Sequence, residues 1–321
     1  MYRRSLIGSA AAAGLLPAVS RAQSFPSKQI RIVVGAAAGG GADIVARILA
    51  QELTKNGGLS ILVDNKPGAG GTVATREALR APADGHTLMM ANVGVLAVIP
   101  YATKDAGYDP RADITPVCLA VDFSNMVVVH PSVPAKTLAE YLALARRPDG
   151  MDYGTSGVGS AGHLAGELLK SMSGARLNHV PFRGGGPAMT DLVGGHVPSV
   201  IASAPTATGF VRDGRIRALA VTGAKRSPFD PDIPTVAELG FPGYAATNWY
   251  AVVVSSKTPP DIVAVLNTIV AKAFGAPEVR AAYGQQGMET LGGTTAEAVS
   301  HITRETAVWK KVIADSGIRL E

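Results

Sequence analysis

The stretch "VVGAAAGGGADIVAR", Val33–Arg47, runs from an apolar segment through a glycine cluster into a helical pattern. Glycines between a strand and a helix let backbone N–H groups approach a ligand closely, and the helix start adds N–H donors with a partial positive charge. The phosphate-loop pattern is absent because Gly41 is followed by Ala42 and Asp43. The dinucleotide pattern is absent because Ile44 stands where its third glycine is needed. We expect this loop to hold an anion that is not a nucleotide.

Short β-rich runs alternate with helical patterns along the chain. The predicted strands are Gln29–Val34, Ile61–Asp64, His86–Ala91, Met126–Val129, Met151–Ser156, Leu177–Phe182, Arg217–Thr222 and Tyr250–Ser255. This alternation predicts an α/β fold with mostly parallel sheets flanked by helices. A chain of about 300 residues exceeds what one core usually holds, so we expect two lobes.

Two further junctions repeat the order of strand, glycine loop and helix start. One is "YGTSGVGSAGH", Tyr153–His163, in which Ser160 is a candidate N-cap and Ser156 adds a hydroxyl. The other is "VPFRGGGPAMTDL", Val180–Leu192, in which Arg183 precedes the glycines. Such junctions lie at the carboxyl ends of parallel strands, where crevices form. Three helix N-termini that meet at one cleft would make a strong cage for carboxylate groups.

The composition argues against several classes of function. The six histidines show no H-E-x-x-H pattern, and the single Cys118 stands between apolar residues, so we expect no metal, no cofactor and a buried thiol. Neither Ser156 nor Ser160 stands in a G-x-S-x-G elbow. His163 is placed to face a ligand or to pack in the core. Asp43 is placed to cap its helix, to hold a bridging water or to receive a ligand amine.

The N-terminus "MYRRSLIGSAAAAGLLPAVSRAQS" has the pattern of an export signal, with a basic start, an apolar run and small residues at the cleavage site. We expect residues 1–22 to be removed after Ala22, by either the general or the twin-arginine route. The whole chain has a formal charge of +5, and removal of the leader leaves 27 Lys plus Arg against 25 Asp plus Glu, a formal +2. With only 5% aromatic residues, no nucleic-acid-binding surface is indicated.

Several long motifs in the same order give the chain a resemblance to a known family. They include "IRIVV…AGGGADIVAR", "VDNKPGAGGTVA", "PADGHTLMMA", "YGTSGVGSAGHLAGE", "HVPFRGGGPAMTDLVGGHV" and "DIPTVAELGFPGY". The chain resembles the Bug, or tripartite tricarboxylate transporter, extracytoplasmic solute-binding receptors over nearly its whole mature length. The resemblance implies a two-lobed, type II-like periplasmic binding protein that closes on a small organic carboxylate and delivers it to membrane permease subunits. It implies lobes of residues 24–121 plus 226–321 and of residues 122–225, with crossings near Val121 and Val221.

The resemblance also places ligand contacts on the glycine loops. We add His163 to these contacts. The predicted site residues are then Ala37, Ala38, Gly39, Gly40, Gly41, Asp43, Ser156, Gly157, Ser160, His163, Arg183, Gly184 and Gly185. This chain departs from similar members in having Gly35 and Ala36 where Pro and an aromatic residue are usual, and Phe182 where Tyr is usual. The loss of an aromatic wall would widen the pocket or admit a bulkier solute.

These observations favour a monomeric, non-enzymatic receptor in the periplasm. An exported hydrolase or isomerase that acts on a carboxylate would need a general base such as Asp43 or His163 on its substrate. A receptor that feeds a signalling partner would use the same pocket and is a third reading.

Overall fold

The computed structural model describes residues 25–316 and residue 319, so the predicted export signal and its cleavage site lie outside the described residues. The elements follow one another as β1 (Ile30–Val34), α1 (Gly41–Lys55), β2 (Ile61–Asn65), η1 (Ala69–Gly71), α2 (Thr72–Arg80), β3 (Thr87–Asn92), η2 (Gly94–Val98), α3 (Ile99–Ala102), α4 (Pro110–Asp113), β4 (Ile114–Val129), α5 (Leu138–Ala145), β5 (Met151–Thr155), α6 (Ala161–Ser173), β6 (Leu177–Pro181), α7 (Gly185–Val193), β7 (Ser199–Ser203), α8 (Ala204–Arg212), β8 (Arg217–Val221), β9 (Thr247–Ser255), α9 (Pro260–Gly275), α10 (Pro277–Gln285), β10 (Glu289–Gly292) and α11 (Thr295–Ser316).

The strands form one curled sheet in the order β2-β1-β3-β9-β4-β7-β5-β6, with β10 and β8 also paired to β4. The α/β class is therefore confirmed, but the sheet is mixed. The pairs of β1 with β2 and β3, and of β5 with β6 and β7, are parallel. The pairs that involve β4 or β9 are antiparallel, because both strands run in the opposite direction to their neighbours in the sheet.

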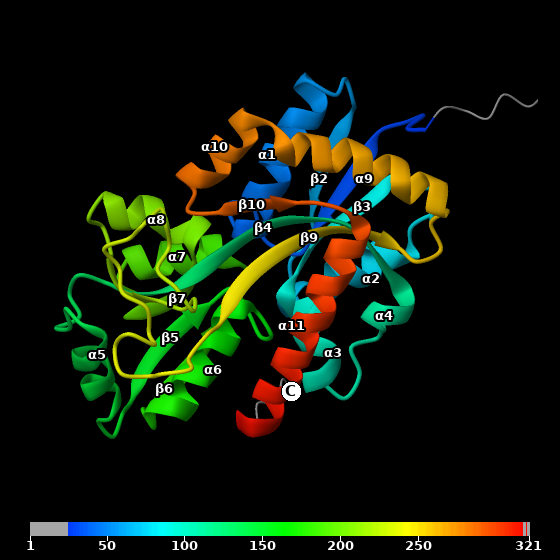
Figure 1. Cartoon of the computed structure of the whole chain (residues 1–321). Coiled ribbons are helices and arrows are strands. Elements are labelled where there is room, and N and C mark those ends of the chain that lie inside the picture. Colours follow the sequence, from blue (N-terminus) through cyan, green and yellow to red (C-terminus); the bar gives the residue numbers. More distant parts are fainter. Residues whose placement is uncertain (1–24, 317–318, 320–321) are drawn as a thin grey trace, which may run out of the picture.

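The strands β4 and β9 join the two halves of the molecule (Figure 1). The first part of β4 pairs with β9 and β10, and its last residues, from Asn125, pair with β7 and β8. The chain leaves β8 at Val221 and stays beside that half, since Tyr244 donates its hydroxyl to the Ala165 carbonyl at 2.8 Å and the Ala246 N–H reaches the Thr222 carbonyl at 2.8 Å. It then returns as β9.

Each face of the sheet carries its own apolar core, because successive strand side chains point to opposite faces. Val33 belongs to one core, whereas its neighbours Ile32 and Val34 belong to the other. Helices α1, α9 and α10 cover one face of the first half, and α2, α3 and α11 cover the other (Figure 1). Cys118 is fully buried, as expected, and burial raises the pKa of its thiol to about 12.

Two strands are missing from the predicted set, and both have weak sequence signals. Strand β7 has only five residues and lies directly between Pro198 and the start of α8. Strand β10 has only four residues, "ETLG". In the described part of the chain, no single helix is long and apolar enough to cross a membrane, although the bent pair α9 and α10 would pass by length and composition. No group of three His, Cys, Asp or Glu suited to a metal occurs within residues 25–316 and 319.

Candidate functional site

A narrow cavity lies where the loops after β1, β5 and β6 meet the middle of the sheet. The space open to the centre of a water-sized sphere is about 40 Å³. Uncharged side chains line it, and most of them are small. The residues are Gly35, Ala36, Gly41, Ala42, Gly70, Gly71, Met89, Met90, Asn92, Asn125, Ser156, Ser160, Gly162, Gly184, Gly185, Ala188, Val200, Ile201, Ala202, Ser203, Asn248 and Tyr250.

Helices α1, α6 and α7 all begin at this cavity. Gly41, Gly162 and Gly185 stand in their first turns and line the wall. The first N–H groups of a helix have no intrahelical partner, and the helix dipole places a partial positive charge on them. The cavity is thus surrounded by backbone donors suited to an anion, although no Lys or Arg of the described residues lines it.

Asp43 shapes the first loop from within and does not line the cavity. Its Oδ2 accepts the Gly39 N–H and the Arg47 Nε–H, both at 2.9 Å, and its Oδ1 accepts from Asn65 at 2.9 Å. Burial raises the pKa of this carboxyl, but the three hydrogen bonds together lower it by more than burial raises it. The pKa of Asp43 therefore lies below its usual value. Asp43 is 2% exposed and its oxygens are occupied, which makes it a clamp on the loop.

Gly39 is the residue in this loop whose conformation requires glycine. Its φ is +77°, in the left-handed region that other residues rarely adopt. The Asp43 carboxylate holds the Gly39 N–H, so the two residues together fix the turn that leads into α1.

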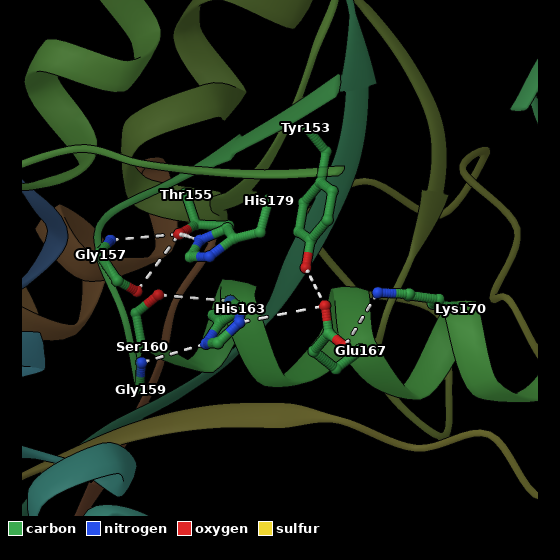
Figure 2. A network of polar contacts seen from close by, with 9 residues as sticks. All are labelled: Tyr153, Thr155, Gly157, Gly159, Ser160, His163, Glu167, Lys170 and His179. Atoms are coloured by element: carbon green, nitrogen blue, oxygen red, sulfur yellow. Dashed lines mark hydrogen bonds and ion pairs between the residues drawn. The ribbon is translucent and has the colours of Figure 1, made fainter. Parts of the chain in front are cut away.

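The loop between β5 and α6 is held by its own polar network (Figure 2). The Gly157 N–H donates to Thr155 Oγ1 at 3.1 Å, and the Gly159 N–H donates to His163 Nδ1 at 3.2 Å. Ser160 is the N-cap of α6, as predicted, since its Oγ accepts the His163 N–H at 3.3 Å. The Ser160 hydroxyl proton is therefore free to donate to a ligand, whereas the Gly157 N–H is already used.

His163 lies behind this loop, stacked on His179 with ring centroids 3.9 Å apart (Figure 2). Burial lowers the pKa of His163, a shift that Glu167 opposes. Burial, with help from His163 and Lys170, lowers the pKa of His179 to about 3. Both rings are neutral near pH 7, and His163 does not reach the cavity wall.

The loop between β6 and α7 brings the two halves into contact. A Cβ atom on Gly184 would lie 3.0 Å from the Ala37 nitrogen, and one on Gly186 would lie 3.0 Å from the Ala38 oxygen. Arg183 is exposed and makes no hydrogen bond or ion pair within the described residues. The glycines rather than the arginine therefore form this side of the cavity.

The cavity wall contains some of the predicted residues and not others. Gly41, Ser156, Ser160, Gly184 and Gly185 line it. The other predicted residues are not part of this wall, and they are Ala37, Ala38, Gly39, Gly40, Asp43, Gly157, His163 and Arg183. Of these, Asp43 and His163 hold their loops in place.

Sequence reasoning missed the polar residues on the strands and the loop of η1. Asn92, Asn125 and Asn248 lie in or at the ends of apolar strands, where asparagine is disfavoured, and this was an available signal. Gly70 and Gly71 lie in the stretch "KPGAGG". A Cβ on Gly35 would come within 2.7 Å of the Gly71 Cα, so the backbone of this loop fills the place beside Gly35.

Two α/β halves that share strands and face a common cavity define the class of periplasmic binding proteins. Residues 45–318 match the model of the tripartite tricarboxylate transporter family receptor. The chain is 33% identical to BugT of Bordetella pertussis over 313 residues, which cover 97% of this chain and 96% of BugT. The chain belongs to this receptor family.

Solved structures agree with this assignment. A protein of R. palustris solved with adipate is 36% identical, with a TM-score of 0.88, and the match covers 92% of this chain and 99% of that one. MatC of Rhodopseudomonas palustris, solved with bound malate, is 29% identical, with a TM-score of 0.86 and coverage of 90% and 100%. The fold is therefore that of solute-binding proteins.

Proposed function

We propose that this chain is a periplasmic receptor that captures a small organic carboxylate and delivers it to the membrane subunits of a tripartite transporter. The observation that carries the proposal is the meeting of three helix N-termini, those of α1, α6 and α7, at one cavity without a basic side chain in its wall. Backbone dipoles and N–H donors complement a carboxylate at such a place. The adipate and malate of the two solved relatives are both dicarboxylates.

The ligand contacts are proposed for the first turns of these helices and for the hydroxyls of Ser156 and Ser160. Ala37 to Gly40, Gly157 and the turn of Arg183 set the loops that carry them. Asp43 acts as the clamp on the first loop and His163 as the support of the second.

The two lobes are proposed as residues 24–121 plus 226–321 and residues 122–225. The change of partners along β4 supports the first crossing. After the second crossing, Tyr244 and Ala246 still contact the second half before β9 begins. Closure about these two strands would then trap the ligand.

Binding is proposed to occur without chemical conversion. A general base must reach the proton that it removes. Asp43 is enclosed by Gly39, Arg47 and Asn65, and His163 accepts the Gly159 N–H behind the loop. Neither group is placed to act on a molecule in the cavity.

The chain is proposed to reach the periplasm after cleavage behind Ala22 and to act there as a monomer. The basic start, apolar run and small residues before Gln23 support export. The measured mass of the periplasmic protein should correspond to an N-terminus at Gln23.

Native mass spectrometry of the purified mature protein, followed by calorimetry with the solute that it retains, tests the proposed function. We expect one carboxylate per chain, released unchanged, and a smaller radius of gyration with ligand in small-angle scattering. Conversion of the solute to a product at catalytic rates, or failure to bind any carboxylate, would overturn the proposal.

A further inference from the structure

Two asparagines on the strands that join the halves line the cavity and are almost fully buried. Asn125 of β4 is 1% exposed and Asn248 of β9 is 6% exposed. Asn248 Nδ2 donates to Asn125 Oδ1 at 3.3 Å. The remaining atoms, Asn125 Nδ2 and Asn248 Oδ1, are buried with no hydrogen-bond partner in the protein. The pair therefore presents an amide nitrogen and a carbonyl oxygen that have no partner in the protein.

This arrangement does not depend on how the two amides are oriented. Turning both by half a turn reverses their mutual hydrogen bond, and it again leaves one donor and one acceptor unused. Buried amide groups in folded proteins are almost always paired. The Asn125 backbone N–H is held by Thr222 Oγ1 at 3.0 Å. A water molecule or a group of a bound ligand would complete the pair of amides.

The chemistry of the pair selects the kind of group. A carboxylate oxygen accepts from the free N–H but repels the neighbouring carbonyl oxygen. An ammonium group donates to the carbonyl and leaves the N–H unpaired. A hydroxyl accepts one hydrogen bond and donates another, so a single hydroxyl of a ligand can satisfy both unused groups, in place of a water molecule.

We infer that Asn125 and Asn248 are specificity-determining residues that bind a hydroxyl of the solute, so that the receptor selects a small hydroxycarboxylate. The inference rests on the proposed function, in which the helix N-termini bind the carboxylate. The pair lies on β4 and β9, the two strands that cross between the halves.

Calorimetry with acids that differ by a single hydroxyl tests the inference on the wild-type protein. The probes are succinate with malate, glutarate with 2-hydroxyglutarate, propionate with lactate, and butyrate with 3-hydroxybutyrate. In the pair whose chain length fits, we expect the hydroxylated acid to bind about 10-fold or more tightly than its partner, from two neutral hydrogen bonds. Equal affinity within each pair, with clear binding of carboxylates, would overturn the inference and leave the proposed function standing.

Variants locate the effect. Asn125→Ala and Asn248→Ala should reduce the preference for the hydroxylated acid to less than about 3-fold. Asn267→Ala is the matched control, because this amide donates to the Val117 and Gly293 carbonyls, outside the cavity wall. It should keep the full preference. A preference that survives in the folded Asn125 and Asn248 variants would contradict the assignment, and binding of no probe at all would contradict the proposed function as well.

Discussion

Gly70 of η1 lies so close to Val158, in the loop before α6, that a Cβ atom on Gly70 would come within 2.5 Å of the Val158 carbonyl oxygen. Gly94 has the same relation to the Gly159 oxygen, also at 2.5 Å. At the loop before α7, a Cβ atom on Gly184 would lie 3.0 Å from the Ala37 nitrogen. The two halves thus touch through backbone on both sides, and the structure has the geometry of a closed cleft.

Gly70→Ala should hinder this closure. We expect ligand affinity to fall by about 10-fold or more, because the closed state that binds the ligand becomes a minor one. Small-angle scattering should show a smaller ligand-dependent contraction than in the wild type.

Gly214→Ala is the control for the backbone strain of this change. The φ angles are +62° at Gly70 and +70° at Gly214, but a Cβ on Gly214 would meet nothing within 4 Å. Both variants should lose similar stability, on the order of 1–2 kcal/mol. If Gly214→Ala weakens binding as much as Gly70→Ala does, contact between the halves is not the cause.

Gly41→Ala and Arg183→Ala separate a backbone cage from an arginine clamp. A Cβ on Gly41 would lie 2.8 Å from the Tyr250 hydroxyl and 2.9 Å from Ser203 Oγ, so it would crowd the cavity wall. We expect Gly41→Ala to reduce affinity by about 10-fold or more, and Arg183→Ala by less than about 3-fold, since salt screens an exposed guanidinium. The opposite order in calorimetry would mean that Arg183 holds the anion.

Local sequence signals were sufficient for the elements that begin at the cavity. The glycine cluster before α1, the Ser160 cap of α6 and the glycines before α7 are read from neighbouring residues, and the structure has each of them. Ser160 lies in the cavity wall because it is the N-cap of α6, and the helix begins at the cavity.

The rest of the site depends on contacts between distant segments. Asn125 and Asn248 meet because β4 and β9 pair across the sheet, and no local pattern states that pairing. The choice between the two places expected for His163 depends on a similar contact, since His179, from the next strand, offers a stacking partner behind the loop. The sequence predicted only the end of β4, Met126–Val129, whereas the strand begins at Ile114.

Stability should fall as the pH rises from about 4 to about 7, through Asp122 of β4. Burial raises the pKa of this carboxyl to about 7, with help from Glu305 and from Glu289, its partner on β10. The folded chain thus keeps a proton that the unfolded chain releases near pH 4, so deprotonation favours unfolding. The loss should be on the order of 1–3 kcal/mol, because the carboxyl is partly exposed.

Urea denaturation at several pH values measures this effect in the wild type and in Asp122→Asn. The amide cannot ionise, so this variant should show a flatter dependence on pH and should be the more stable protein at pH 8. Asp213→Asn, at an exposed position, should follow the wild type. An unchanged pH dependence in Asp122→Asn would show that another group is responsible.

Ser160 should serve both the fold and the ligand, and three variants separate the two roles. Ser160→Ala removes the N-cap of α6, which should cost about 1 kcal/mol of stability. It also removes a hydrogen bond to a charged ligand, which should weaken binding by about 10- to 150-fold. Calorimetry and urea denaturation of the same samples measure both effects.

Thr137→Ala is the control for the cap, because Thr137 caps α5 outside the cavity wall and its Oγ1 accepts the Glu140 N–H at 3.2 Å. It should lose a similar stability, on the order of 1 kcal/mol, and keep its affinity. Ser160→Asp should keep the stability of the protein and lose affinity for the ligand. A carboxylate caps a helix well, but it places a negative charge where the anion binds. Tight carboxylate binding by folded Ser160→Asp would place the anion elsewhere than at the start of α6.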